Sequence, residues 1–222
     1  MRAPISVVIP TLNAAASLSD TLAALVEGLD AGLVTELIVS DGGSTDGTQA
    51  LADAWGANVI EGAPSRGGQL RRGCAAARAP WLMVLHADTV LEPGWSDVVA
   101  AHLGKTGAGY FRLRFDRGGS FVAGWANRRA RWFGLPYGDQ GLVMPRTLYD
   151  QAGGYPDIPL MEDVAMARAL RGHLHPLDAV AVTSATRYRA QGWIRRGARN
   201  LWLLMQYLGG ADPHRLAARY RA

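Results

Sequence analysis

Acidic side chains stand at three places in the chain where their chemistry could handle a metal ion, a proton or a sugar hydroxyl. The motif His86-Ala87-Asp88 follows an apolar run and pairs an imidazole with a carboxylate two residues later. Such a pair can hold a hard cation that bridges phosphate oxygens, and Mg²⁺ or Mn²⁺ suits these ligands. The competing interpretation is an ordinary hydrogen-bonded strand end, which a lone motif of this kind favours.

Glu162 and Asp163 are adjacent acids at the expected start of a helix. One of them can act as a general base that takes the proton from an acceptor hydroxyl. Acids at this position also stabilise a helix through its dipole, so helix capping is the alternative.

Two further segments could bind a nucleotide. The segment 41–46 reads Asp-Gly-Gly-Ser-Thr-Asp. Its first acid can accept hydrogen bonds from a base or a ribose, and its glycines let the backbone approach a ligand. The same residues also make a turn with a helix cap. The segment 66–72 combines arginines with glycines at a helix start, an arrangement that can bind a diphosphate. It matches neither the P-loop nor the dinucleotide-binding pattern.

Alternating strand and helix patterns indicate how these groups are positioned. Apolar runs predict strands over 5–9, 36–40, 58–61 and 81–85, and helical spacing predicts helices over 18–29, from 48 to about 55, and over 68–78. This alternation predicts a doubly wound, mostly parallel sheet, whose ligands bind outside the carboxyl ends of the strands. The residues Pro10-Thr11, Asp41 and His86-Ala87-Asp88 therefore share one predicted crevice.

The second half of the chain is less regular. It predicts strands over 109–115, 140–144 and 179–183, and helices over 121–133, 162–171 and 192–208. With 222 residues, 49% of them hydrophobic, the chain can build one sizeable core, and we expect a single domain over 1–222.

The amino-acid composition argues against disulfide-stabilised, membrane-spanning and nucleic-acid-binding proteins. A single cysteine, Cys74, excludes an intramolecular disulfide framework. Neither a signal peptide nor a membrane-spanning stretch is evident, which favours a cytoplasmic protein. The net charge is +4, and arginines gather near the carboxyl end without any nucleic-acid-binding signature, so we expect no nucleic-acid partner. Those arginines indicate affinity for donor or lipid phosphates, or simply a solvated surface.

The last long helix carries Trp193, Trp202 and Tyr207 beside arginines. An aromatic and basic helix can lie at the inner membrane face as a peripheral contact. The alternatives are packing against the sheet or against a second subunit in a homodimer.

Taken together, these motifs resemble the inverting glycosyltransferases of family 2, which have the GT-A fold. The resemblance rests on Val7-Val-Ile-Pro-Thr-Leu-Asn13, on the segment 36–48, on Leu85-His-Ala-Asp88 and on Glu162-Asp163, and it covers nearly the whole chain. It implies a three-layer α/β/α sandwich with a mostly parallel, Rossmann-like central sheet. It also implies a nucleotide-sugar-binding half over 1–103 and an acceptor-binding half over 104–222.

The resemblance assigns roles by position. It implies that the donor nucleotide contacts Pro10, Thr11, Asn13, Asp41, Gly43, Arg66, Arg71 and Ala87, with Asp41 recognising the base. Asp88, with His86, would hold Mn²⁺ or Mg²⁺. Asp163 would be the general base, Glu162 would orient the acceptor, and Asp139 and Gln140 would bind it. The implied donor is a UDP-sugar, with a GDP-sugar as the alternative, and the implied acceptor is a sugar, a lipid or a small molecule.

One departure from the family pattern is His86, which replaces the first acid of the Asp-x-Asp turn. This substitution is similar to a subgroup of small bacterial members, some of them grouped with radical-SAM and selenium-related genes. The Gln-x-x-Arg-Trp pattern of processive members is missing, so we expect transfer of one sugar. Two other functions stay open: a nucleotidyltransferase, although the lysine-bearing phosphate loop is absent, and a catalytically weak module that binds nucleotide-sugar or lipid phosphate.

Overall fold

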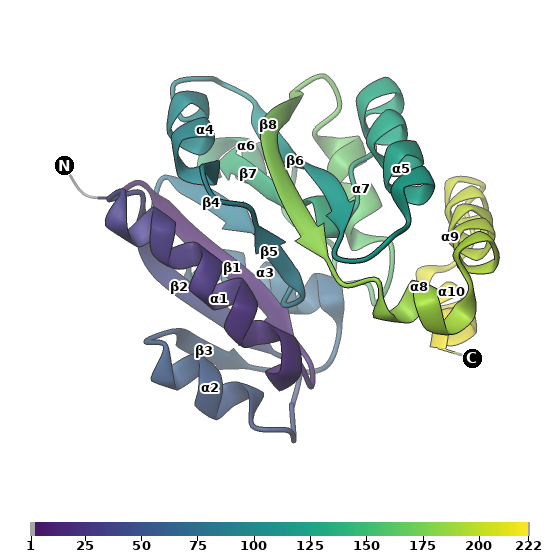
Figure 1. The fold of residues 1–222 in the computed structure, drawn as a ribbon, viewed down its shortest axis with the longest axis horizontal. Coiled ribbons are helices and arrows are strands. Elements are labelled where there is room, and N and C mark those ends of the chain that lie inside the picture. The colour runs from purple at the N-terminus through teal and green to yellow at the C-terminus, as the bar shows by residue number, and fades with distance from the viewer. Residues whose placement is uncertain (1–2, 222) are drawn as a thin grey trace.

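The strands of the chain form one mixed sheet, which the computed structural model describes within residues 3–221 (Figure 1). Its order is β3-β2-β1-β4-β7-β6-β8-β5. Parallel strands β1 (Ile5–Thr11), β2 (Val34–Asp41), β3 (Asn58–Glu61) and β4 (Trp81–Val84) make the first part. Strand β7 (Leu142–Pro145) runs antiparallel to β4 and to β6 (Ala108–Phe115). Strand β8 (Leu174–Thr183) runs parallel to β6, and β5 (Thr89–Leu91) closes the edge antiparallel to β8.

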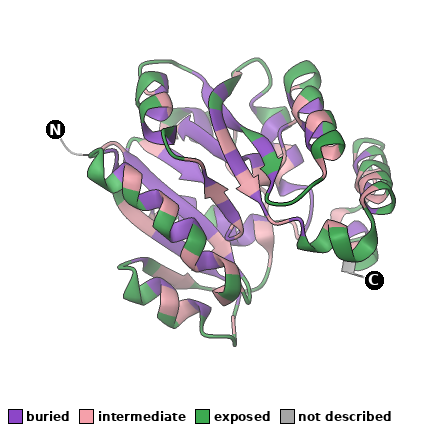
Figure 2. Ribbon diagram, in the orientation of Figure 1, coloured by how far each residue is buried: buried purple, intermediate pink, exposed green. Residues whose placement is uncertain are grey.

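Helices cover both faces of this sheet and make the predicted three layers. One apolar core lies under α1 (Ala15–Asp30), α2 (Thr48–Ala54) and α4 (Trp95–His102). The other lies under α3 (Arg66–Ala76), α5 (Ser120–Phe133), α6 (Arg146–Gln151) and α7 (Glu162–Ala169). Within β1, Val7 faces the first core and Val8 the second, because successive side chains of a strand point to opposite faces. Figure 2 shows the strands buried between the two layers.

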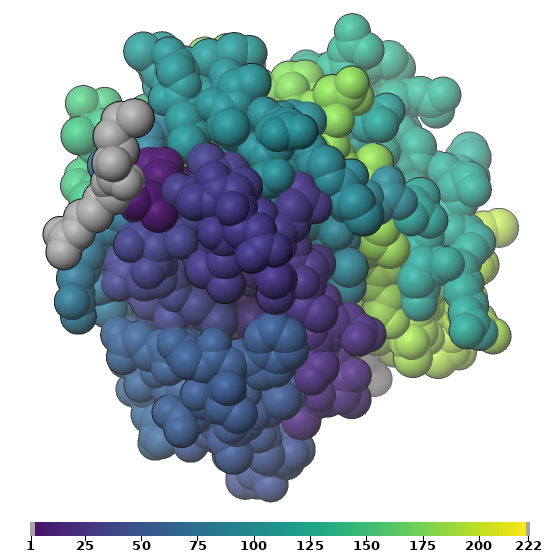
Figure 3. Space-filling model, turned by 60° about the vertical axis from the view of Figure 1, so that its left-hand side comes forward, coloured from purple at the N-terminus to yellow at the C-terminus, as the bar shows by residue number. Residues whose placement is uncertain are grey.

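Three helices gather at the opposite end of the molecule from the amino terminus: α8 (Thr186–Gln191), α9 (Trp193–Leu208) and α10 (Pro213–Arg221) (Figure 1). Leu203 and Leu204 of α9 and Leu216 of α10 are buried in a separate apolar cluster with Val164 of α7. In the space-filling view the amino-terminal half packs directly against the later segments (Figure 3). No helix between residues 3 and 221 has the length and apolar character needed to cross a lipid bilayer.

The structure differs from the sequence predictions mainly in the second half. Strand β8 begins at Leu174, five residues earlier than predicted, and includes Pro176. Its pairing with β6 shifts register between Tyr110 and Arg112. This irregularity breaks the alternation of apolar and polar residues in β8 that would have predicted a strand. Gln140 ends a 3-10 turn over Gly138–Gln140 instead of starting β7. The short elements β5, α4, α6, α8 and α10 had no prediction.

Candidate functional site

A cavity of about 670 Å³ opens at the carboxyl ends of β1 and β4, where the sequence placed the crevice. Its walls come from both halves of the chain, including the 3-10 turn before β7, the start of α7 and the inner side of α9. Nine of the predicted site residues line it: Pro10, Thr11, Asn13, Arg66, His86, Ala87, Asp88, Asp139 and Asp163. The fold therefore brings together side chains that are up to 153 positions apart, from Pro10 to Asp163.

Asp41 lies outside the lining and is completely buried. Its Oδ1 accepts a hydrogen bond of 2.8 Å from the Thr11 hydroxyl, and its Oδ2 accepts from the backbone N–H groups of Gly43 and Ser44 at 2.8 and 2.7 Å. Burial alone would raise its pKa, but hydrogen bonds, the first of them from Gln49, outweigh burial and lower the pKa to about 2. The carboxylate is therefore charged and fixes the shape of the loop that follows β2.

Gly43 supports the same loop with a φ of +89°, which favours glycine, and it is exposed outside the cavity. Arg71 is exposed on α3 and does not reach the lining. Gln140 is buried, and its amide donates to the carbonyl of Phe111 at 3.2 Å. These three predicted residues thus shape or flank the site without facing the cavity.

Backbone strain is concentrated at the cavity. Within residues 3–221, Asn13 and Met161 are the two non-glycine residues with positive φ, at +50° and +69°, and both line the cavity. Asn13 is held there because its side-chain oxygen accepts from the N–H of Thr45 at 2.9 Å, while its own N–H donates to Ser44 at 2.8 Å. Met161 immediately precedes Glu162 and Asp163. Strained conformations of this kind persist where surrounding contacts enforce them, and they cluster at functional sites.

The turn after β4 presents His86 and Asp88 to the cavity. A methyl group on Gly138 would come within 2.2 Å of the His86 Nε2 atom, so the ring lies directly against that glycine. Burial, together with the positive charge of Arg66, lowers the pKa of His86 to about 4. The imidazole is therefore neutral at pH 7 and keeps one nitrogen lone pair available as a ligand.

The carboxylates around this turn are suited to a divalent cation. No residue in the described part of the chain hydrogen-bonds the Asp88 side chain. Asp139 has a buried oxygen without a partner, and its pKa is raised to about 6, first by burial and then by the nearby charges of Asp163 and Asp88. A cation would relieve this repulsion. Residues 3–221 contain no group of three His, Cys, Asp or Glu with complete metal-site geometry, so phosphate and water oxygens would supply the other ligands, as Mg²⁺ and Mn²⁺ accept.

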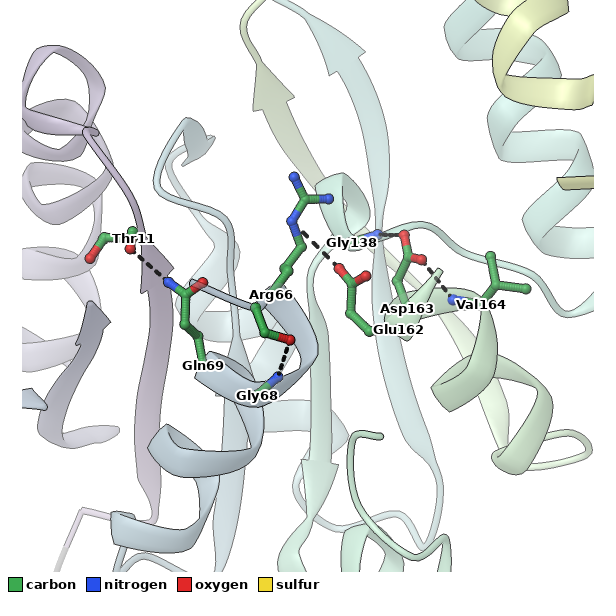
Figure 4. A network of polar contacts seen from close by, with 9 residues as sticks. Thr11, Arg66, Gly68, Gln69, Gly138, Glu162, Asp163 and Val164 are labelled. Carbon is green, nitrogen blue, oxygen red and sulfur yellow. Dashed lines mark hydrogen bonds and ion pairs between the residues drawn. The ribbon is translucent and has the colours of Figure 1, made fainter. Parts of the chain in front are cut away.

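Arg66 points toward Glu162 at the start of α7, and Asp163 follows it on the same helix (Figure 4). The Arg66 Nε atom lies 3.5 Å from Oε1 of Glu162, whose carboxylate is fully buried and makes no hydrogen bond within the described residues. Asp163 accepts from the N–H of Gly138 at 2.8 Å and from the N–H of Val164 at 2.7 Å. These two donors fix the Asp163 carboxylate at the cavity edge, while Glu162 stays behind it.

Burial raises the pKa of Glu162 to about 7, although Arg66 acts in the opposite direction. The folded protein therefore binds more protons than the unfolded chain between the ordinary pKa of 4.5 and about 7, and stability falls as pH rises through that interval. The full shift corresponds to roughly 3 kcal/mol. We expect the melting temperature of the metal-free protein to decline between pH 5 and pH 8, and Glu162→Gln to flatten that decline.

Thermal melts in EDTA across this pH range check the expectation. Glu61→Gln, which removes an exposed acid at the end of β3, is the matched control and should leave the slope unchanged. An identical pH dependence in Glu162→Gln and in the unaltered protein would contradict the assignment.

Several cavity residues had no prediction. Gln69 donates to the carbonyls of Thr11 and Ser40 at 2.6 and 3.0 Å, and so ties the ends of β1 and β2 together beside the cavity. Arg187 and Arg196 also line the cavity. The gathering of arginines near the carboxyl end signalled their presence, but only the fold shows that they turn toward this site.

Comparisons with known proteins show what the chain is similar to. The family described as Glycosyl transferase family 2 matches residues 6–156, more than half of the chain. An uncharacterized glycosyltransferase of Mycobacterium tuberculosis is 35% identical over 102 residues, which cover 46% of this chain and 44% of that protein. Glucosyl-3-phosphoglycerate synthase of M. tuberculosis is 37% identical over 98 residues, which cover 39% of this chain and 29% of that protein. The matched part thus spans less than half the length of these relatives.

Solved structures share the fold. The mannosyltransferase PcManGT from Pyrobaculum calidifontis, in complex with GDP-Man and Mn²⁺, aligns with a TM-score of 0.67 and 18% identity over 96% of this chain and 66% of its own. Glucosyl-3-phosphoglycerate synthase from M. tuberculosis, with Mn²⁺ and UDP-glucose, aligns with a TM-score of 0.59 and 23% identity over 82% and 69%. The likeness confirms the predicted GT-A type of α/β architecture.

Proposed function

The chain belongs to glycosyl transferase family 2, and on this premise we propose that it transfers one sugar from a nucleoside-diphosphate sugar to an acceptor hydroxyl, with inversion at the anomeric carbon. The observation that carries the proposal is the pairing of two carboxylates in one cavity. Asp88 faces it without a partner among residues 3–221, and Asp163 faces it with its orientation fixed by two backbone N–H groups.

The donor would lie against residues of the first half, 1–103, and the acceptor against residues of the second half, 104–222. We propose Pro10, Thr11, Asn13 and Ala87 as nucleotide contacts, with Asp41 and Gly43 shaping the loop behind them. A UDP-sugar is the proposed donor. Glucosyl-3-phosphoglycerate synthase holds UDP-glucose and Mn²⁺, which supports this choice, while GDP-Man in the mannosyltransferase keeps a GDP-sugar as the alternative.

Asp88 would hold a divalent metal, Mn²⁺ or Mg²⁺, and the neutral imidazole of His86 is the proposed second ligand. When bound, the metal would neutralise charge on the diphosphate leaving group. Arg66 is placed to add positive charge beside the diphosphate, because its guanidinium group lines the same cavity. The histidine supports membership of the small bacterial subgroup with a His-Ala-Asp turn.

Asp163 would take the proton from the acceptor hydroxyl, which attacks the anomeric carbon from the face opposite the diphosphate. Its two N–H donors leave the remaining lone pairs of the carboxylate free for that proton. Asp139 lines the cavity beside it and is the proposed acceptor contact, whereas Glu162 would act from behind through Arg66.

A thermal-shift screen followed by a turnover assay tests the proposal. We expect UDP and UDP-glucose to raise the melting temperature in the presence of Mn²⁺ and to have little effect in EDTA, since a ligand that binds only the folded state stabilises it. Release of UDP from a UDP-sugar, at a rate that increases when an acceptor is added, would support sugar transfer. Metal-dependent binding without turnover on any donor would instead favour a binding module, and release of pyrophosphate from a nucleoside triphosphate would favour a nucleotidyltransferase.

A further inference from the structure

Large apolar side chains are exposed at one end of the molecule. In the part of the chain that the structure describes, thirteen large hydrophobic residues are exposed, and nine of them lie on α5 and α9. They are Phe121, Trp125, Trp132 and Phe133 on α5, and Ile194, Leu201, Trp202, Met205 and Leu208 on α9. Phe121 is 84% exposed and Ile194 is 86% exposed. So strong a concentration differs from the scattered single residues of an ordinary surface and marks an interaction site.

Helix α9 is apolar on two sides. Leu203 and Leu204 face the body of the protein and are buried. The exposed residues Ile194, Leu201, Trp202, Met205 and Leu208 follow the spacing i, i+7, i+8, i+11, i+14, which places them on a single stripe of a helix. A surface helix usually turns a polar face to water, so the outer stripe of α9 is unpartnered.

Helix α5 and the start of α9 lie at the same end of the molecule (Figure 1), where Ala123 and Ala126 of α5 and Trp193 of α9 pack in one apolar cluster. A methyl group on Gly119, the residue before α5, would come within 2.0 Å of the Trp193 ring at the start of α9, so the two helices begin in direct contact. Phe121, Trp125 and Trp132 follow the spacing i, i+4, i+11 and form an exposed stripe on α5.

The charge around both stripes has one sign. Residues 186–220 contain seven arginines and a single acid, Asp212, and α5 contains three arginines and no acid. Of these arginines, Arg129 and Arg196 are buried and Arg187 lines the cavity. Arg128 and Arg131 on α5 and Arg195 on α9 are exposed. The apolar side chains of this surface suit a partner with an apolar interior, and the arginines around them suit a partner with an anionic surface.

We propose that α5 and α9 dock the protein onto an anionic lipid bilayer. The aromatic and aliphatic side chains of the two stripes would enter the interface between head groups and acyl chains. The arginines would contact lipid phosphates, and each would add to the attraction toward a negatively charged leaflet. Removal of the outer stripe of α9 from water would add to this electrostatic attraction.

A second copy of the same chain is a weaker occupant for this surface. A twofold dimer joins the same patch on both subunits, so the exposed Arg128, Arg131 and Arg195 of one copy would be brought close to those of the other. Like charges opposed at close range are destabilising, whereas an anionic bilayer neutralises them.

Residues of the outer stripe do not line the catalytic cavity, which takes Arg196, Asn200 and Leu203 from the inner side of α9. Binding to lipid and binding to a nucleotide can therefore be measured separately. If the protein does not bind lipid, the proposed binding of a nucleotide is not contradicted, and the reverse also holds.

The experiment is co-sedimentation of the purified full chain with sucrose-loaded vesicles. One set contains phosphatidylcholine alone, and the other contains phosphatidylcholine mixed with phosphatidylglycerol. We expect the protein to sediment with the mixed vesicles, to stay soluble with phosphatidylcholine, and to be released by raising the salt concentration to about 1 M, where charges are screened beyond about 3 Å. The double variant Trp202→Glu with Met205→Glu should lower the partition coefficient by at least about tenfold, since it removes two large apolar side chains from the interface.

Trp55→Glu is the matched control, because Trp55 is 42% exposed at the end of α2, outside both stripes. It should bind the mixed vesicles like the unaltered protein. Melting temperature and the Mn²⁺-dependent shift by UDP report whether each variant is folded, and Phe121→Glu provides an independent variant on α5. Three results would overturn the proposal: no sedimentation of the unaltered protein with mixed vesicles, equal binding by the unaltered protein and both stripe variants, or a dimer in analytical ultracentrifugation that the double variant abolishes.

Discussion

Replacing Asp163 with asparagine is expected to lower turnover by about 10²–10⁴-fold, the usual cost of losing a general base. Asparagine has nearly the same shape and keeps one oxygen to accept from the N–H of Gly138 or of Val164, which now share the Asp163 carboxylate. The amide cannot accept a proton from the acceptor hydroxyl. We therefore expect Mn²⁺-dependent binding of UDP to survive, because the proposed nucleotide contacts belong to other elements.

Initial rates of UDP release, with thermal shifts by UDP and Mn²⁺ measured in parallel, check this result. Glu162→Gln is the control variant, since it neutralises the neighbouring acid on the same helix turn. Glu162 is fully buried and outside the cavity lining, so its loss should reduce turnover far less than Asp163→Asn does. A nearly normal rate in Asp163→Asn would rule out Asp163 as the base, and a larger loss in Glu162→Gln would assign the base to Glu162 instead.

The first half of the fold could be predicted because its strands are short, apolar and buried. Successive residues Val7 and Val8 of β1 face opposite cores, so the strand reads as a continuous apolar run. The polar residues that end β1 and β4 then had to meet at one edge of the sheet, which is how Thr11 and Asp88 could be placed in one cavity from sequence alone.

The second half could not be predicted as well because tertiary contacts determine it. Strand β8 contains Pro176 and exposed residues that carry no strand pattern, and its pairing with β6 holds it in place. The role of Gln69 could not be predicted from the sequence for a similar reason. Its role as a cross-link between two strand ends depends on two backbone carbonyls, and backbone groups leave no signature in a sequence.

Asp41 has contacts in the site that its motif does not reveal. The motif was assigned to a nucleotide base, yet every hydrogen bond the structure gives this carboxylate comes from its own loop and from its neighbours Thr11 and Gln49. An aspartate at the end of a predicted strand tells us where its negative charge lies in the fold. Whether that charge faces the ligand or holds the loop is decided by the surrounding donors.

Replacing Asp88 with asparagine is expected to abolish the Mn²⁺-dependent shift in melting temperature by UDP and to lower turnover by at least about 100-fold. The reason is that Asp88 is a cavity carboxylate with no hydrogen-bond or ion-pair partner among residues 3–221, and so the principal ligand left for a cation. An amide oxygen binds a hard cation more weakly than a carboxylate does, and the stabilisation of the leaving diphosphate disappears with the metal.

His86→Asn is the companion variant, and it tests whether the histidine contributes to metal binding. If His86 is a ligand or orients one, metal affinity should fall by about 10–100-fold while the response to saturating Mn²⁺ is kept. Titrating Mn²⁺ against a fixed UDP concentration measures this difference for each variant. Retention of the full Mn²⁺-dependent shift in Asp88→Asn would contradict the metal assignment, and loss of that shift in His86→Asn alone would move the principal ligand from the carboxylate to the imidazole. The His86 ring packs against Gly138, whose N–H donates to the Asp163 carboxylate. If His86→Asn lowers turnover even at saturating Mn²⁺, the loss of this packing would have displaced Asp163 through Gly138.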